Sequence, residues 1–321
     1  MSVAWSILRR VTDGYFRSVA PAPYRPNPAQ WRDDQLTVAW LGHATLLINF
    51  FGVRILTDPA LLPRVGVRLG PATLGPKRYV APALLARDLP PLDIVLLTHA
   101  HMDHFDIGTL RKLPRDVTVV TAKHTADLLA GMRFHDVAEI GWSESRRFET
   151  RHGPLTVDAF QVRHWGSRMP RDGPRGYNGY LLERNGCRVC MAGDTAHTSV
   201  AAAGRRGPVD LMAVPIGAYN PWIASHCTPE QAVDMANQAR ARFVVPIHHQ
   251  TFRLSAEPMD EPIQRFVRAL APERIGLTEI GQTFVVPLED ATARVALKHP
   301  TGSRCDREKA ARDVAPPGRE E

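Results

Sequence analysis

The sequence predicts an α/β fold in which two β-sheets pack face to face and helices cover their outer faces. Three observations predict it. β-rich segments come first, strands then alternate with helices, and polar side chains able to bind metal recur directly after strands, which would gather them at one edge of the sheets. With 321 residues, of which 44% are hydrophobic and 23% charged, the chain can bury a large core, as one domain or as two smaller ones.

The first strands are predicted at residues 36–41, 45–51 and 53–57. Residues 36–53 carry no charge and by length alone could span a membrane. Gly42, His43, Asn49 and Gly52 interrupt the run, so successive strands with tight connections are the better interpretation. Residues 58–91 then form a stretch rich in proline, glycine and arginine, for which we expect a surface loop of the kind that often carries function.

Strands and helices alternate through the rest of the chain. Apolar, β-branched runs predict further strands at residues 92–97, 117–121, 155–163, 179–183, 188–192, 211–215, 243–247 and 283–287. Helical spacing predicts helices at residues 107–113, 123–132, 229–241 and 262–271. The third helix has the clearest start, with Thr228 as N-cap, Pro229 in the first turn and Gln231 completing a capping box.

We expect the folded domain to span residues 36–290, with an N-terminal extension over 1–35 and a polar, disordered tail over 291–321. Residues 1–19 lack the apolar core and cleavage site of a secretory signal. Their apolar residues fall near helical spacing among arginines, so a short amphipathic helix could dock on the protein core or touch a membrane surface. Docking on the core is favoured, and peripheral contact with the inner membrane is the alternative.

Charge and cysteine content narrow the function classes and the compartment. The formal charge of +7 favours anions such as phosphates or acidic lipids, but the arginines are scattered among acids, so no nucleic-acid partner is expected. Four cysteines are too few and too irregularly placed for a disulfide framework, which favours a cytoplasmic protein. The CxxC of Cys187 and Cys190 lies within a predicted strand, so its thiols should point to opposite faces and serve core packing.

The most informative motif is Thr-His-Ala-His-Met-Asp-His-Phe-Asp at residues 98–106, directly after a predicted buried strand. In extended backbone His99 and His101 point the same way and can share one ion, whereas Asp103 and His104 follow the turn and can face a second ion. The alternatives are a histidine-rich surface loop, or a helix start at which Asp106 caps the residues that follow.

Three further residues lie just past predicted strands, as this motif does: His164, Asp194 and His248. Each has another interpretation when taken alone, as a core histidine, a turn aspartate or an ordinary residue at a strand end. Their joint occurrence after strands favours one cleft with a dinuclear metal site.

These motifs carry a family resemblance. The residue 98–106 motif, His164, the turn Gly193-Asp194-Thr195 and His248 resemble the metallo-β-lactamase-fold hydrolases. Further matches over residues 36–266 resemble the branch of N-acyl-phosphatidylethanolamine-hydrolysing phospholipase D and its bacterial relatives: Trp40-Leu-Gly-His-Ala-Thr45, Leu56-Thr-Asp-Pro59, Gly75-Pro-Lys-Arg78, Arg163-His-Trp165, Pro215-Ile-Gly-Ala-Tyr219, His226 and Thr228-Pro-Glu-Gln-Ala232.

The resemblance implies a four-layer αββα sandwich with two metal ions at one edge. It implies a ligand set in which His99, His101 and His164 bind the first ion, Asp103, His104 and His248 bind the second, and Asp194 bridges both. The last motif reads His248-His249 where relatives often have His-Trp, so either histidine could be the ligand, although His248 keeps the register. Nitrogen and oxygen ligands without a thiolate suit two Zn²⁺ ions and would also accept iron or manganese.

Two ions about 3.5 to 4 Å apart would lower the pKa of a bridging water, and we expect the resulting hydroxide to attack a phosphodiester of a phospholipid or of another small molecule. Asp103 would orient the water and Asp194 would bridge the ions. His226 lies before a capped helix and could bind the phosphate, donate a proton to the leaving group, or merely pack there. Tyr219 and Asn220 are candidate substrate-binding residues, and His43 and Asp106 are candidates for holding the ligands in place.

The ligands alone leave other chemistry open. The same hydroxide can attack a carbonyl carbon, so a lactonase or another hydrolase of C–O or C–N bonds is the alternative. A non-catalytic metal-binding protein ranks below both, because a full ligand set then has little purpose. A nuclease would normally bring a basic or aromatic platform, which this sequence does not indicate.

Overall fold

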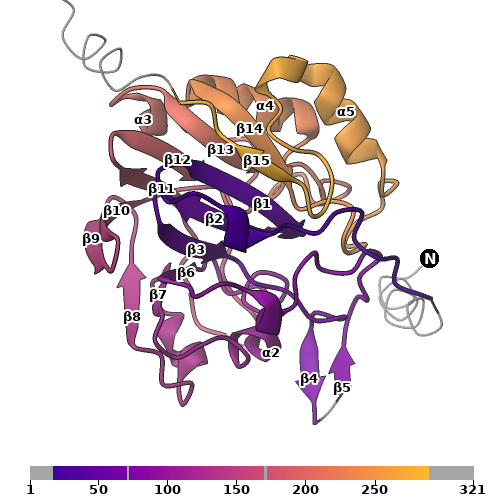
Figure 1. Cartoon of the computed structure of the whole chain (residues 1–321). Helices are drawn as coiled ribbons and strands as arrows, with labels where there is room; N and C mark the ends of the chain where they lie inside the picture. The colour runs from indigo at the N-terminus through magenta and orange to yellow at the C-terminus, as the bar shows by residue number, and fades with distance from the viewer. Residues whose placement is uncertain (1–16, 71, 170–171, 289–321) are drawn as a thin grey trace, which may run out of the picture. The chain divides into compact units, whose positions relative to one another are not determined.

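The computed structural model describes residues 17–70, 72–169 and 172–288. Contacts group residues 1–287 into one unit and residues 288–321 into a second, of which only Leu288 is described. In the first unit two large β-sheets face each other and helices lie outside them, as the sequence predicts (Figure 1). The expected N-terminal amphipathic helix and the expected disordered tail lie outside the described residues, and the predicted domain limits stay predictions.

The first sheet has seven strands in the order β15-β1-β2-β3-β6-β7-β8. Its strands are β1 Leu36–Gly42, β2 Thr45–Phe50, β3 Val53–Thr57, β6 Ile94–Leu96, β7 Thr118–Ala122, β8 Asp136–Ile140 and β15 Thr283–Val285. β2 is antiparallel to β1 and to β3, whereas β3, β6, β7 and β8 are parallel. The carboxyl ends of β1, β3 and β6 therefore meet at one edge of this sheet.

The second sheet has six strands in the order β14-β13-β12-β11-β10-β9. Its strands are β9 Ser145–Thr150, β10 Gly153–Phe160, β11 Gly179–Arg184, β12 Cys187–Met191, β13 Val209–Pro215 and β14 Ala241–Ile247. β12, β13 and β14 are parallel, and β10 runs in the same direction because both β10 and β12 are antiparallel to β11. Four carboxyl ends therefore meet at one edge here as well.

Two helices, α4 Pro229–Gln238 and α5 Glu261–Ala269, cover the second sheet (orange in Figure 1). Residues of β12, β13 and β14 form one buried cluster with α4 and with Phe266 of α5. α4 begins with the predicted capping box, in which Thr228 and Gln231 bond each other's backbone N–H. Cys190 faces this cluster, and Cys187, three residues earlier in the strand, lies on the opposite face, so the CxxC serves core packing.

The remaining helical segments are short: α2 Ile107–Leu110, α3 Ala201–Gly204, η1 Pro28–Gln30, η2 Ala86–Asp88, η3 Ala126–Leu129 and η4 Pro272–Arg274. The predicted α-helix over 123–132 is wrong, because only the single 3-10 turn η3 forms there. The backbone N–H groups of Thr125 and Ala126 donate to the side chain of Glu139 in β8, so the start of η3 is bonded to the sheet.

The stretch over 58–91 is more ordered than a simple surface loop. It contains the hairpin of β4 Val67–Leu69 and β5 Ala72–Leu74, and it is anchored by Arg78, whose guanidinium is buried. Arg78 donates to the carbonyls of Val80 and Ala60 and lies over the ring of Phe252. The expected surface loop is therefore corrected to a segment that contains a hairpin and is held to the core by Arg78.

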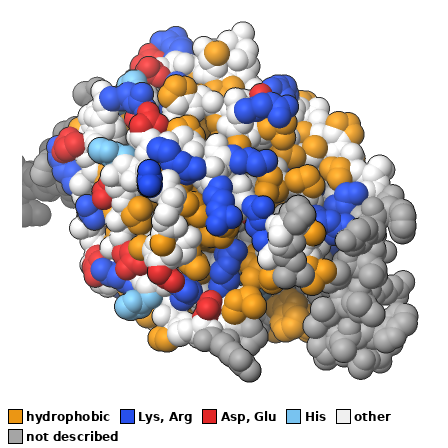
Figure 2. Space-filling model, turned by 90° about the horizontal axis from the view of Figure 1, so that it is seen from below, with side chains coloured by type: hydrophobic (Ala, Val, Ile, Leu, Met, Phe, Trp, Pro, Cys, Tyr) orange, Lys and Arg blue, Asp and Glu red, His pale blue; other side chains and the backbone are white. Residues whose placement is uncertain are grey.

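Charged side chains are common on the face seen in Figure 2. Several Lys and Arg side chains lie through the middle of this face with hydrophobic ones between them, and acidic side chains lie mostly toward its edge. Within the described ranges, none of the helices is both long and apolar enough to cross a bilayer.

Candidate metal centre

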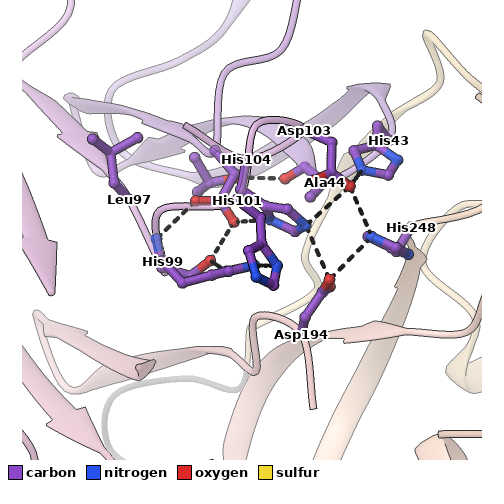
Figure 3. A network of polar contacts seen from close by, with 12 residues as sticks. His43, Ala44, Leu97, His99, His101, Asp103, His104, Asp194 and His248 are labelled. Carbon is purple, nitrogen blue, oxygen red and sulfur yellow. Dashed lines mark hydrogen bonds and ion pairs between the residues drawn. The ribbon is translucent and has the colours of Figure 1, made fainter. Parts of the chain in front are cut away.

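The predicted metal ligands gather where the carboxyl ends of strands from both sheets meet. The first sheet supplies His43 after β1 and the 98–106 segment, here called the ligand loop, after β6. The second sheet supplies His164 after β10, Asp194 after β12 and His248 after β14. Figure 3 shows Asp194 pointing across from the second sheet toward His248 and the ligand loop.

Three histidines form the first group of ligand atoms. His99 Nε2 lies 2.9 Å from His101 Nδ1, and His164 Nε2 lies 3.2 Å from the same atom. All three side chains belong to one set that could hold a metal ion. The common direction expected for His99 and His101 in extended backbone is thus observed, and His164 joins them from the other sheet.

A second group forms around Asp103 Oδ2, which lies 3.4 Å from His248 Nε2 and 3.8 Å from His104 Nε2. Asp194 stands between the two groups. Its Oδ2 is 3.1 Å from the Nε2 atoms of both His104 and His248, and 4.0 Å from His164 Nε2. This is the position that a carboxylate bridging two ions requires.

The other ring nitrogen of several histidines is held by a fixed partner. His99 Nδ1 lies 2.9 Å from Thr98 Oγ1, His104 Nδ1 lies 2.8 Å from Asp58 Oδ2, and His164 Nδ1 lies 2.9 Å from the carbonyl of Ser225. An acceptor at Nδ1 places the proton there and leaves the Nε2 lone pair free for a metal ion.

Asp58 is a functional residue that the sequence analysis missed. Its carboxylate accepts hydrogen bonds from Thr98 N at 2.8 Å and Thr98 Oγ1 at 2.7 Å, besides holding His104. The residue was visible only as part of a family motif, because its position after β3 becomes meaningful once β3 and β6 are known to be neighbours.

The buried carboxylates and histidines of the cluster shift one another's pKa values. Burial raises the pKa of Asp194, but His104 and His248 outweigh it and hold that pKa well below its usual value. Burial lowers the pKa of His104, yet Asp194, Asp103 and Asp58 raise it well above its usual value. Among the described residues, His104 Nε2, His248 Nε2 and Asp194 Oδ1 are buried and have no hydrogen-bond partner. Buried nitrogen and oxygen atoms without such partners fit a site for two divalent cations.

His248, and not His249, points into the cluster. The His249 ring is buried and stacks on Trp40, with ring centroids 4.5 Å apart, and burial lowers its pKa to about 3. The backbone of His248 is left-handed, with φ of 64°, and its carbonyl lies so close to Gly217 that a Cβ there would meet it at 2.3 Å. The sharp turn after β14 therefore requires glycine at position 217, two residues after β13.

Of the two residues expected to hold ligands in place, His43 lies at the ligands and Asp106 does not contact them. His43 Nε2 is 2.9 Å from Asp103 Oδ2. Asp106 instead caps α2, accepting from Gly108 N and from the backbone and hydroxyl of Thr109. The expected support by Asp106 is corrected to a helix cap, because all its bonds are made within its own turn.

A cleft of about 220 Å³ opens beside the cluster, lined by His101, Asp103, Trp165, Asp194, Ala218, Trp222, His226, His248 and Leu254. His226 Nδ1 is buried without a hydrogen-bond partner, 3.9 Å from Asp194 Oδ2, and burial lowers the pKa of His226 to about 4. Sequence reasoning missed Trp222 as a lining residue and met Trp165 only inside a motif.

Tyr219 and Asn220, the candidate substrate residues, are not among those lining this cleft. The Tyr219 side chain is buried, and its hydroxyl donates to Glu261 at 2.7 Å and accepts from Arg265 at 3.2 Å. The hydroxyl of Tyr219 is therefore engaged by α5 and not turned to the cleft. Contact of Asn220, whose side chain is exposed, with a substrate stays a prediction.

Comparison with known proteins gives one matching family and several relatives. The model of the Beta-lactamase superfamily domain matches residues 53–249. An uncharacterised protein of Mycobacterium tuberculosis is 30% identical over 89% of this chain and 76% of its own length. N-acyl-phosphatidylethanolamine-hydrolyzing phospholipase D 1 of Caenorhabditis elegans is 30% identical over 70% of this chain and 68% of its own length. A metal-dependent hydrolase of Exiguobacterium is 29% identical over 72% of this chain and 92% of its own length.

Solved structures share the fold at lower identity. The isothiocyanate hydrolase from Delia radicum gut bacteria aligns with a TM-score of 0.62 and 18% identity, covering 78% of this chain and all of that chain. A metallo hydrolase from the archaeon Ignicoccus hospitalis aligns with a TM-score of 0.58 and 19% identity, covering 79% of this chain and all of that chain. Both support the two-sheet sandwich fold.

Proposed function

Because the chain belongs to the metallo-β-lactamase superfamily and is a metal-dependent hydrolase, we propose that it is a zinc-dependent phosphodiesterase that cleaves a phospholipid or another small phosphodiester. One observation carries the proposal: Asp194 Oδ2 stands between a group of three histidine nitrogens and a group formed by Asp103, His104 and His248. A site of this kind holds two ions side by side.

Zinc is the proposed metal because the donors are imidazole nitrogens and carboxylate oxygens, which zinc binds in tetrahedral sites. When bound, two zinc ions supply a water of lowered pKa and positive charge for the phosphoryl oxygens. Iron and manganese accept the same donors and are the alternatives for the test below.

The residues of the chain supply orientation and proton handling. Asp103, itself held by His43, lies at the cleft and can accept a hydrogen bond from the attacking water. His226 is neutral at neutral pH, because burial lowers its pKa, and it can offer an N–H to a phosphoryl or leaving-group oxygen. Its Nδ1 has no hydrogen-bond partner among the described residues and is available for this contact.

The rim of the cleft supports a substrate with an apolar part. Trp165 and Trp222 line the cleft and remain 45% and 46% exposed. Met169 and Ile223, which follow these tryptophans in the chain, are exposed as well. Large apolar side chains rarely stay exposed beside a catalytic cleft without a use, and a phospholipid would cover them. The similarity to a phospholipase D of Caenorhabditis elegans points the same way. A cytoplasmic location with peripheral membrane contact stays a prediction.

The test uses purified protein stripped of metal and reloaded with zinc, iron or manganese. A bis-aryl phosphodiester, a fluorogenic phospholipid, a lactone and a β-lactam are assayed side by side. Zinc-dependent cleavage of the phosphodiester or the phospholipid is expected. Fast lactone turnover without phosphodiester cleavage would replace the proposal by the carbonyl-directed alternative.

The matched variants are Asp194→Asn and Asp210→Asn. Asp194→Asn removes the carboxylate at the centre of the cluster and should lose metal and activity together. Asp210 is a buried carboxylate at the opposite end of β13, where it accepts from Arg188 N, so its variant should keep both. A fully active Asp194→Asn protein without metal would contradict the proposed chemistry.

A further inference from the structure

Arg168 connects the two loops that bring metal ligands from opposite sheets. It lies four residues after His164, in the segment between β10 and β11. Its Nη1 donates to the carbonyl of Ala100 at 2.9 Å and to the carbonyl of Phe105 at 2.8 Å. Both acceptors belong to the ligand loop. One nitrogen from the segment between β10 and β11, here called the His164 loop, therefore bonds the ligand loop at two points.

The two carbonyls flank the ligands of that loop. Ala100 lies between His99 and His101, and Phe105 directly follows His104. Inside the loop, the N–H groups of His104 and Phe105 both turn to the carbonyl of His101. Ala100 and Phe105 are fully buried, so without Arg168 their carbonyls would lose a partner that water cannot easily replace.

Arg168 is itself held in place. Asp172 accepts from the backbone N–H groups of Arg168 and Met169, at 3.0 and 3.1 Å. Gly166, two residues before Arg168, packs so tightly that a Cβ there would lie 2.2 Å from the carbonyl of Arg175. These contacts hold residues 166–169 in place, so the Arg168 guanidinium reaches the ligand loop from a fixed backbone.

Charge adds to the geometry. Burial lowers the pKa of Arg168, and the attraction of Asp106 and Asp103 opposes that shift. An arginine stays charged in such a setting, so it keeps a positive charge beside the carboxylate of Asp103. The same side chain fixes the backbone of the ligand loop through its two bonds to carbonyls.

We propose that Arg168 is a positioning residue that sets the affinity of the cluster for its metal ions by fixing the ligand loop against the His164 loop. The proposal rests on the part of the proposed function that assigns metal binding to this cluster, and it is independent of the substrate. Removing a residue that orients metal ligands typically weakens metal binding about 10- to 100-fold.

The experiment measures zinc affinity of the stripped full-length protein by competition with a chromophoric chelator, without any substrate. Wild-type protein is titrated first, because absence of zinc binding there would refute the metal assignment itself and not the role of Arg168. Arg168→Met is then expected to bind zinc about 10- to 100-fold more weakly, with circular dichroism showing an unchanged fold.

Arg188→Met is the matched control. Arg188 is a buried arginine that, like Arg168, donates to two backbone carbonyls, those of Gly207 and Ala203, and it does so away from the ligand loop. Its variant should bind zinc as tightly as wild type. Unchanged affinity in Arg168→Met, or an equal loss in Arg188→Met, would overturn the proposal.

Arg168→Lys covers the case in which the methionine variant does not fold. Lysine keeps the charge and a donor but has a shorter reach and no planar fork, so an intermediate loss of zinc affinity is expected. If Arg168→Met is unfolded and Arg168→Lys binds zinc as tightly as wild type, the positioning role is refuted.

Discussion

Replacing Asp58 by asparagine isolates the effect of a residue that holds a metal ligand without touching metal. Asp58 has a left-handed backbone, with φ of 36°, a conformation that asparagine adopts readily and alanine does not. The variant therefore keeps the shape of the turn after β3. It changes only the charge of the side chain and the acceptor that faces His104 Nδ1 or Thr98.

The magnitude follows from the bonds that Asp58 makes. Its Oδ2 accepts from His104 Nδ1 and from Thr98 Oγ1, and its Oδ1 accepts from Thr98 N. An asparagine amide has one oxygen, so at least one of these donors would face an NH₂ group. Weaker orientation of His104 should reduce metal affinity about 10- to 100-fold, which corresponds to roughly 1.4 to 2.8 kcal/mol.

The assay is zinc titration of the stripped variant against a chelator, with Asp93→Asn as control. Asp93 is also a buried carboxylate and accepts from the backbone N–H of Arg54, but it precedes β6 whereas the ligand loop follows that strand. Its variant should bind zinc normally. Asp58→Asn with wild-type zinc affinity would show that the histidine orientation does not depend on this carboxylate.

Three further predictions concern regions around the site. Glu257→Gln should lower the thermal midpoint by an amount equivalent to about 1–3 kcal/mol, since the buried carboxylate accepts from Ala218 N and Asn220 N; Ser255→Ala, which removes only a hydroxyl donor to Glu257, should cost less in the same melting experiment. In a Cys305→Ser variant, which leaves Cys187, Cys190 and Cys227, the three buried thiols should react with a disulfide reagent only after denaturation. Burial also raises the pKa of Cys190 to about 12, and rapid reaction of the native protein would contradict the buried positions. The bond from Arg265 lowers the pKa of Glu230 from 4.5 to about 2, so its stabilisation is present above pH 4.5 and is lost as the pH falls toward 2; Glu230→Gln should melt with a shallower pH dependence in that window, and an unchanged slope would refute the pair's contribution.

The clustering of the candidate metal ligands could be predicted from sequence because each follows an apolar run that is typical of a strand. His164, Asp194 and His248 come from strands that point the same way, so placing residues after strands placed them together. Asp58 also follows a predicted strand, at residues 53–57, but neither Asp58 nor Arg168 could be assigned a role this way. Their roles depend on which loops become neighbours, and a lone aspartate or arginine carries no local signal for that.

The fold was predictable where burial dictates the pattern. The buried central strands were all found, within a few residues of their ends. β9 was missed because its sequence Ser-Arg-Arg-Phe-Glu-Thr is that of an exposed edge strand, with Phe148 as its single buried residue. Its pairing with β10 supplies the missing stabilisation, and that pairing is a tertiary property.

The ligands come from both sheets, so ions bound among them would act as a cross-link between the two halves of the sandwich. Binding that is tight in the native state and weak in the unfolded chain adds free energy of unfolding in proportion to the logarithm of metal concentration. Thermal stability should then rise with free metal and fall with chelation, even for variants that turn over no substrate. Metal supply would thereby govern how long the folded protein survives, besides how fast it reacts.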